Sequence, residues 1–138
     1  MLQGNGMEEY MSWGLFERGC LALARKVQSF DVENVYGLPR GGLVPAVKLS
    51  HILELPLLTD AKKIGKRTLI VDDIADSGKT LSEFKEQRKA TLYYCRQSRV
   101  VPDAWVYEKT DRWVVFPWEV LRDKREPAYA AGAEPKKL

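Results

Sequence analysis

The stretch from Thr68 to Asp73, TLIVDD, constrains the fold of this chain more than any other part of its sequence. Its first four residues are uncharged and three of them are aliphatic, which is typical of a strand buried on both faces. A strand this apolar does not end in two adjacent acids for packing reasons. Because ligands of open α/β sheets bind beyond the carboxyl ends of the strands, Asp72 and Asp73 predict a ligand site at this edge.

The rest of the chain predicts strands that alternate with helices, which favours a parallel α/β sheet in a single domain. Apolar residues recur at helical spacing after Ser12, which is a plausible N-cap. We expect that domain over residues 9–122, after a flexible N-terminus at 1–8 and before a polar tail at 123–138. The expected helices span 12–30, 43–53 and 77–88, and the expected strands span 35–36, 55–58, 68–71, 91–95, 104–107 and 113–116.

Composition narrows the classes of partner. The chain has 138 residues and a net charge of only +3, so a nucleic-acid-binding protein is not indicated. Cys20 and Cys95 are the only cysteines and His51 the only histidine, which excludes a disulfide framework and a His-rich metal site and fits a reducing cytoplasm. No apolar run approaches the ~20 residues of a membrane span, and the polar start lacks the features of a signal peptide.

The segment that follows the acids, ADSGKT at 75–80, is suited to a phosphate. At the start of the expected helix, free amides and the helix dipole would favour an anion, and Gly78 would allow close backbone approach. Ser77 and Thr80 add hydroxyl donors. Neighbouring residues of an extended chain point to opposite sides, so Asp72 and Asp73 can serve different partners, such as a sugar hydroxyl and a metal. Together these features predict a sugar phosphate ligand.

A nucleotide-triphosphatase P-loop is the competing interpretation, and its spacing fails. Gly78-Lys79-Thr80 matches the end of the P-loop pattern, which requires its first glycine at position 73. Asp73 stands there instead, and its carboxylate would repel a triphosphate.

Two motifs of this chain resemble those of type I phosphoribosyltransferases. VDDIADSGKTL, residues 71–81, is similar to the signature that binds phosphoribosyl pyrophosphate (PRPP), and GLPRGGLVPA, residues 37–46, resembles the pyrophosphate loop. The resemblance implies that the pyrophosphate is held by Arg40, Gly41 and Gly42. It also implies a cis peptide bond between Pro39 and Arg40. The 5′-phosphate would be held by Ala75, Asp76, Ser77, Gly78, Lys79 and Thr80.

The stretch VVPDAWVYEKTDRWVVFPWE, residues 100–119, is similar to the purine-binding end of the small xanthine-guanine members of that family. The resemblance places Trp113 against the purine face and the backbone of Val114 at the purine edge. Arg96 is the best match to the basic residue that meets the 6-oxo group, although the lysine usual in the family is absent there. Of the other tryptophans in this region, Trp105 and Trp118 are expected to be structural.

The resemblance implies a parallel twisted sheet flanked by helices, with a small C-terminal hood. The reaction it implies transfers ribose 5-phosphate from PRPP to a purine such as guanine, xanthine or hypoxanthine. Asp72 would hold a ribose hydroxyl, Asp73 would contact Mg²⁺, and Asp76 would handle the purine proton. The family also implies a homo-oligomer, a dimer or a tetramer.

One departure keeps two other functions open. The long arm that closes over the site in the family is reduced here to residues 59–67, where Lys62, Lys63, Lys66 and Arg67 form either a charged rim or a solvated surface. A PRPP- or nucleotide-binding regulatory module with little catalysis is therefore one alternative. A phosphoribosyltransferase that acts on a pyrimidine is the other.

Overall fold

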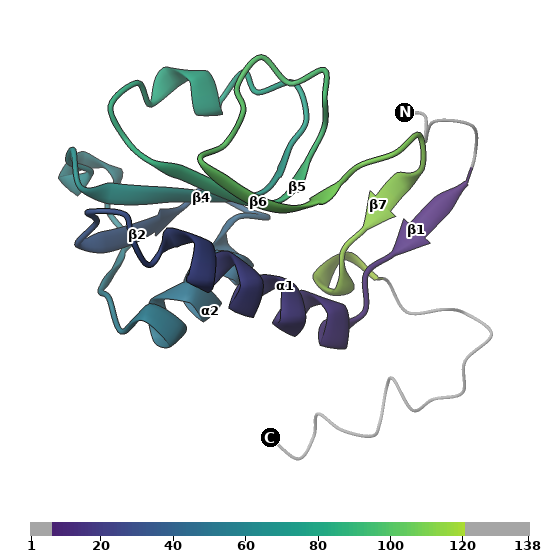
Figure 1. The fold of residues 1–138 in the computed structure, drawn as a ribbon, viewed down its shortest axis with the longest axis horizontal. Coiled ribbons are helices and arrows are strands. Elements are labelled where there is room, and N and C mark those ends of the chain that lie inside the picture. The colour runs from purple at the N-terminus through teal and green to yellow at the C-terminus, as the bar shows by residue number, and fades with distance from the viewer. Residues whose placement is uncertain (1–6, 121–138) are drawn as a thin grey trace.

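A computed structural model describes residues 7–120 and places a five-stranded parallel sheet at the centre of the fold (Figure 1). The strand order is β3-β2-β4-β5-β6, and every neighbouring pair is parallel, as the alternating pattern predicted. The predicted extreme N-terminus at 1–6 and the polar tail at 123–138 lie outside the described residues. The bounds of the strands are β2 Asn34–Gly37, β3 Leu57–Leu58, β4 Thr68–Ala75, β5 Lys89–Tyr94 and β6 Ala104–Glu108.

A second, two-stranded sheet lies beside the main one and forms the predicted small hood (Figure 1). It joins β1, Glu8–Tyr10, to β7, Trp113–Val115, in parallel. The sequence did not predict β1, which begins inside the segment expected to be flexible. Three residues carry too little periodicity to identify a strand, and only the pairing with β7 orders them.

Two helices cover one face of the main sheet (Figure 1). α1, Trp13–Val27, begins where predicted, because the Ser12 hydroxyl oxygen accepts a hydrogen bond from the Leu15 amide at 3.0 Å. α2 spans Leu43–Leu53, the predicted bounds. Their apolar stripes meet the strands in one core, and the members with no exposed surface include Cys20, Leu23, Val35, Ala46, Leu49, Leu69, Val71 and Leu92.

The helix predicted over 77–88 is wrong. β4 extends through Ala75, and the segment from 76 to 88 is an irregular loop with one short 3₁₀ turn at Leu81–Glu83. The chain returns to the sheet at Lys89, which pairs with Ile70, so this loop runs back along five strand residues, roughly 17 Å.

The apolar pattern of this loop is too short to hold a helix. Leu81 and Phe84 pack against Leu38, Ile70 and Ala75 on the second face of the sheet. A third anchor would fall at Arg88, which is charged and instead lies over the ring of Phe30, 4.5 Å from its centroid. The second face of the sheet is thus covered by a loop.

Candidate active site

Asp72 and Asp73 belong to the last half of β4 and not to a loop beyond it. The Asp73 amide donates to Oδ1 of Asp72 at 2.9 Å. The two side chains nevertheless line different pockets: Asp72 lies in the pocket of the 76–81 segment, and Asp73 lies in two pockets on the other side. That the two carboxylates serve different partners stays a prediction, with which their different pockets are compatible.

Burial of the two adjacent carboxylates disfavours their charged forms. Burial, and then the adjacent charge of Asp73, raise the pKa of Asp72 to about 8. Burial also raises the pKa of Asp73, and the charge of Glu119 adds to this rise. Near neutral pH Asp72 therefore retains a proton that a bound cation would displace, as expected of an acid placed to meet a positive charge.

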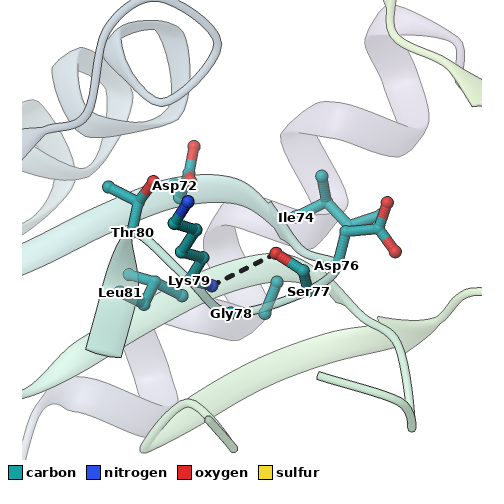
Figure 2. A pocket seen from close by; sticks show the side chains of 9 residues that line it. Asp72, Ile74, Asp76, Ser77, Gly78, Lys79, Thr80 and Leu81 are labelled. Atoms are coloured by element: carbon teal, nitrogen blue, oxygen red, sulfur yellow. Dashed lines mark hydrogen bonds between the residues drawn. The ribbon is translucent and has the colours of Figure 1, made fainter. Parts of the chain in front are cut away.

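The segment from Ala75 to Thr80, which we call the phosphate loop, lines a pocket together with Asp72 and Leu81. Figure 2 shows the Lys79 side chain extending across this pocket, with Asp76 at the opposite end from Asp72. The Lys79 amide donates to the Ser77 hydroxyl oxygen at 3.2 Å. Within residues 7–120 the amides of Ser77, Gly78 and Thr80 donate no hydrogen bond to another protein group.

This pocket could bind an anion without the help of a helix. The predicted helix dipole is absent, so the favourable terms are the free amides, the two hydroxyls and the Lys79 charge. Gly78 has a φ of 79°, which L-amino acids with a side chain rarely adopt. The backbone turn that exposes these amides therefore depends on glycine.

The loop from 38 to 42, which we call the pyrophosphate loop, is anchored to β4. The Leu38 amide donates to the Val71 carbonyl at 2.9 Å, and the Gly42 amide donates to the Leu38 carbonyl at 2.8 Å. The Pro39–Arg40 peptide bond is cis, as the resemblance implied. Arg40 and Gly41 line a pocket with Asp73 and Glu119, whereas Gly42 is buried against the backbone.

A third pocket is lined by both aromatic side chains and carboxylates. Trp113, 41% exposed, and Val114 line it from β7, and Asp73 and Asp76 line it from the β4 end. Trp105 packs on Tyr94 with ring centroids 5.0 Å apart and lines none of the three pockets, whereas Trp118 stacks on Phe116 and also lines the Arg40 pocket. The expected purely structural role therefore fits Trp105 but not Trp118.

Arg96 does not line this third pocket in the structure. It forms an ion pair with Glu108, and its side chain is 82% exposed. The cation that lines the pocket is Lys109, whose amide donates to the Tyr94 carbonyl at 2.9 Å and so continues the sheet pairing past β6. Sequence reasoning missed Lys109, although its place directly after the 104–107 strand was a usable signal.

The three pockets are contiguous. Ile74 and Asp76 line both the phosphate-loop pocket and the Trp113 pocket, while Asp73 and Glu119 line both the Trp113 pocket and the Arg40 pocket. Glu119, which sequence reasoning also missed, ends a 3₁₀ turn at Pro117–Glu119 and accepts the Phe116 amide at 3.0 Å. The three pockets are thus joined through the shared carboxylates of Asp73, Asp76 and Glu119.

The last residue of the short 59–67 connection does not form an arm over this site. The Arg67 carbonyl accepts the Glu33 amide just before β2, at the amino end of the sheet, and its side chain pairs with Asp31 and Glu33. The charged-rim alternative therefore fails for Arg67. Lys62 and Lys63 lie in a 3₁₀ turn at Ala61–Lys63, and both are exposed.

Comparison with known proteins gives a consistent result. No protein-family model matches the chain. A xanthine-guanine phosphoribosyltransferase of Cereibacter sphaeroides is 30% identical over 86% of this chain and 90% of that protein. The structure of a purine phosphoribosyltransferase from Pyrococcus horikoshii superposes with a TM-score of 0.71 and 34% identity, covering 84% of this chain and 97% of that one. A Helicobacter pylori xanthine-guanine-hypoxanthine phosphoribosyltransferase, at 23% identity and a TM-score of 0.73, has the same fold; the match covers 82% of this chain and 93% of that one.

Proposed function

Because this chain belongs to the type I purine phosphoribosyltransferases, we propose that it transfers ribose 5-phosphate from PRPP to a 6-oxopurine and releases pyrophosphate. The contiguity of the three pockets carries this proposal. PRPP presents a phosphate and a pyrophosphate at two ends of one ribose, and the purine must reach the carbon between them. The phosphate loop, the Arg40 pocket and the Trp113 pocket supply sites in that arrangement.

Catalysis in this site is mainly positioning and electrostatics. As the C1′–oxygen bond to pyrophosphate breaks, a bond forms from C1′ to a purine nitrogen, and the purine loses one proton. The sugar passes through an oxocarbenium-like state, which nearby carboxylates stabilise. Asp72 holds a ribose hydroxyl, Arg40 and the Gly41 amide hold the leaving pyrophosphate, and Asp76 accepts or shares the purine proton.

The acids at the end of β4 fit Mg²⁺. Mg²⁺ commonly binds one or two protein carboxylates and completes its shell with substrate phosphates and waters. Asp73, with its raised pKa and its position in the Arg40 pocket, would be the protein ligand. The ion would neutralise charge on the pyrophosphate.

The base is recognised by stacking and by one cation. Trp113 offers its indole face, and the backbone of Val114 reads the purine edge. We assign the contact with the electronegative 6-oxo group to Lys109, since Arg96 is engaged by Glu108. A large aromatic face such as that of Trp113 favours a purine over the smaller pyrimidine ring, and the base panel below separates the two.

The test is a panel of radiolabelled bases with PRPP and Mg²⁺, run on the wild type and on Asp76→Ala. We expect nucleotide from guanine, xanthine or hypoxanthine. The variant should retain PRPP binding and lose purine transfer by ~10²-fold or more, the usual scale for an acid–base group. Unchanged turnover in Asp76→Ala would remove that residue from the mechanism.

The regulatory-module alternative rests on the short 59–67 connection. Loss of a closing arm weakens exclusion of water from the reacting sugar. Tight nucleotide binding in calorimetry, combined with no product from any base in the panel, would favour a binding module over the enzyme.

None of the helices within residues 7–120 combines the length and the apolar character needed to cross a membrane. Location in the cytoplasm and assembly into a dimer or tetramer are further proposals, supported by the family resemblance. Analytical ultracentrifugation of the full chain measures the second of them directly.

A further inference from the structure

The phosphate loop has no helix behind it, and a second loop takes that place. We call residues 97–100 the bracing loop. The Arg99 amide donates to the Ser77 carbonyl at 2.9 Å. A Cβ atom on Gly78 would lie 2.4 Å from the Ser98 hydroxyl oxygen and 2.9 Å from the Val100 nitrogen. The two loops therefore touch backbone to backbone, with no room for a side chain between them.

The bracing loop is itself fixed to the end of the sheet. The Ser98 amide donates to the Cys95 carbonyl at 2.9 Å, and the Cys95 amide donates to the Ala75 carbonyl at the same distance. The Ser98 hydroxyl, 9% exposed, donates to the Val100 carbonyl at 2.7 Å. A side chain projecting from this loop thus starts from a defined position relative to β4.

Gln97 is that side chain. Its Nε2 atom donates to Oδ1 of Asp76 at 3.2 Å, across 21 residues of sequence. Among the residues that the structure describes, no other side chain donates a hydrogen bond to this carboxylate. In the orientation that Gln97 holds, Asp76 lines both the phosphate-loop pocket and the Trp113 pocket.

A neutral amide suits this task better than a cation would. A lysine or arginine would fix the carboxylate but also neutralise it, which would weaken it as a partner for the purine proton. An amide restrains the direction of Asp76 and leaves its charge and its second oxygen available. We infer that Gln97 is a positioning residue that holds the Asp76 carboxylate at the junction of the phosphate and base sites; this inference rests on the proposed function.

The test compares Gln97→Glu and Gln97→Met with wild type in guanine–PRPP turnover with Mg²⁺. Gln97→Glu keeps the shape but replaces the donor with a carboxylate that repels Asp76, so kcat/KM for guanine should fall about tenfold. Gln97→Met removes the donor alone and should cost about threefold to fivefold, as the loss of one solvent-accessible hydrogen bond does. KM for PRPP should stay within about twofold in both, because the phosphate amides are unchanged.

Gln87→Glu is the matched control. Gln87 is also exposed, and its Nε2 donates to the Gly65 carbonyl at 3.1 Å near the start of β4, so the same change there should leave turnover unaltered. A double-mutant cycle separates positioning from a general effect on folding: in an Asp76→Asn background, Gln97→Glu should have no further effect.

These results distinguish failure of the proposed function from failure of the inference about Gln97. A wild type that makes no nucleotide overturns the proposed function and this inference with it. An active wild type whose Gln97→Glu variant is equally active overturns the inference alone, as does a Gln97→Glu loss that persists undiminished in Asp76→Asn.

Discussion

A Cβ atom placed on Gly41 would lie 2.1 Å from Oδ2 of Asp73, so the backbone of the pyrophosphate loop directly contacts a carboxylate of β4. The two sequence motifs that identified the family therefore form one site. The contact places the proposed Mg²⁺ ligand against the loop that holds the leaving group. A side chain at position 41 would separate the two.

Gly41→Ala should accordingly impair PRPP binding much more than folding. The methyl group meets the carboxylate end of the Asp73 side chain and not the backbone, so the side chain can rotate away at little cost in stability but then leaves the metal site. We expect KM for PRPP to rise about tenfold or more, as for a lost charge-assisted contact, with the melting temperature nearly unchanged.

Gly65→Ala is the control for this prediction, because nothing lies within 4 Å of a Cβ atom there. It should change neither KM nor melting temperature. A Gly41→Ala enzyme with the wild-type KM for PRPP would contradict the proposed role of this contact.

The raised pKa of Asp72 predicts how the unliganded protein responds to pH. Its folded-state pKa of about 8 lies above the ordinary aspartate pKa of 3.8, so between these pH values the native state binds more protons than the unfolded state. The free energy of unfolding must therefore fall as pH rises across this window, and Asp73, whose pKa is also raised, acts in the same direction.

Asp72→Asn removes the main part of this effect. In a chelator-containing buffer at pH 8, the variant should melt higher than wild type by about 3 °C or more, and the difference should shrink toward pH 4. Thermal unfolding followed by circular dichroism at several pH values measures it. Parallel pH profiles for the two proteins would show that the carboxylate pair is not strained in solution.

Trp113→Ala should weaken purine binding selectively. Stacking of a base on an aromatic side chain is worth ~1–3 kcal/mol, so KM for guanine should rise about tenfold while KM for PRPP holds. Trp105→Phe, which alters a tryptophan packed on Tyr94 outside the three pockets, serves as the control. Equal effects of both substitutions on KM for guanine would argue that Trp113 is only structural.

Lys109→Met and Arg96→Met distinguish the two candidate cations of the base site. If Lys109 meets the 6-oxo group, its loss should lower kcat/KM for guanine about tenfold, since a buried charge-assisted hydrogen bond is lost. Arg96→Met breaks an exposed ion pair with Glu108 and should change little. The opposite ranking in the same assay would return the role to Arg96.

Local sequence was enough to predict the parts of the site that one segment builds. The apolar strand with its acids and the phosphate loop are contiguous, and the α2 bounds follow from a compact apolar pattern. The helix after the phosphate loop was mispredicted because only Leu81 and Phe84 of that segment pack against the sheet, which is too short an apolar stripe to hold a helix there.

Glu119 and Gln97 could not be found in this way, because each enters the site only where the fold places it beside β4, and neither has a local pattern that distinguishes it from a surface residue. Lys109 was missed although its place after the 104–107 strand was a usable signal. Arg96 shows the same limit in reverse: it follows β5 at a suitable position, but its ion pair with Glu108 turns it to solvent.

The central claim is that these three pockets together catalyse transfer from PRPP to a 6-oxopurine, and the assay of product formation tests it most directly. Purified wild type, incubated with PRPP, Mg²⁺ and labelled guanine, xanthine or hypoxanthine in turn, should yield the nucleoside monophosphate and an equal amount of pyrophosphate from at least one base. Protein that binds PRPP in calorimetry but forms no nucleotide from any of the three would contradict the account.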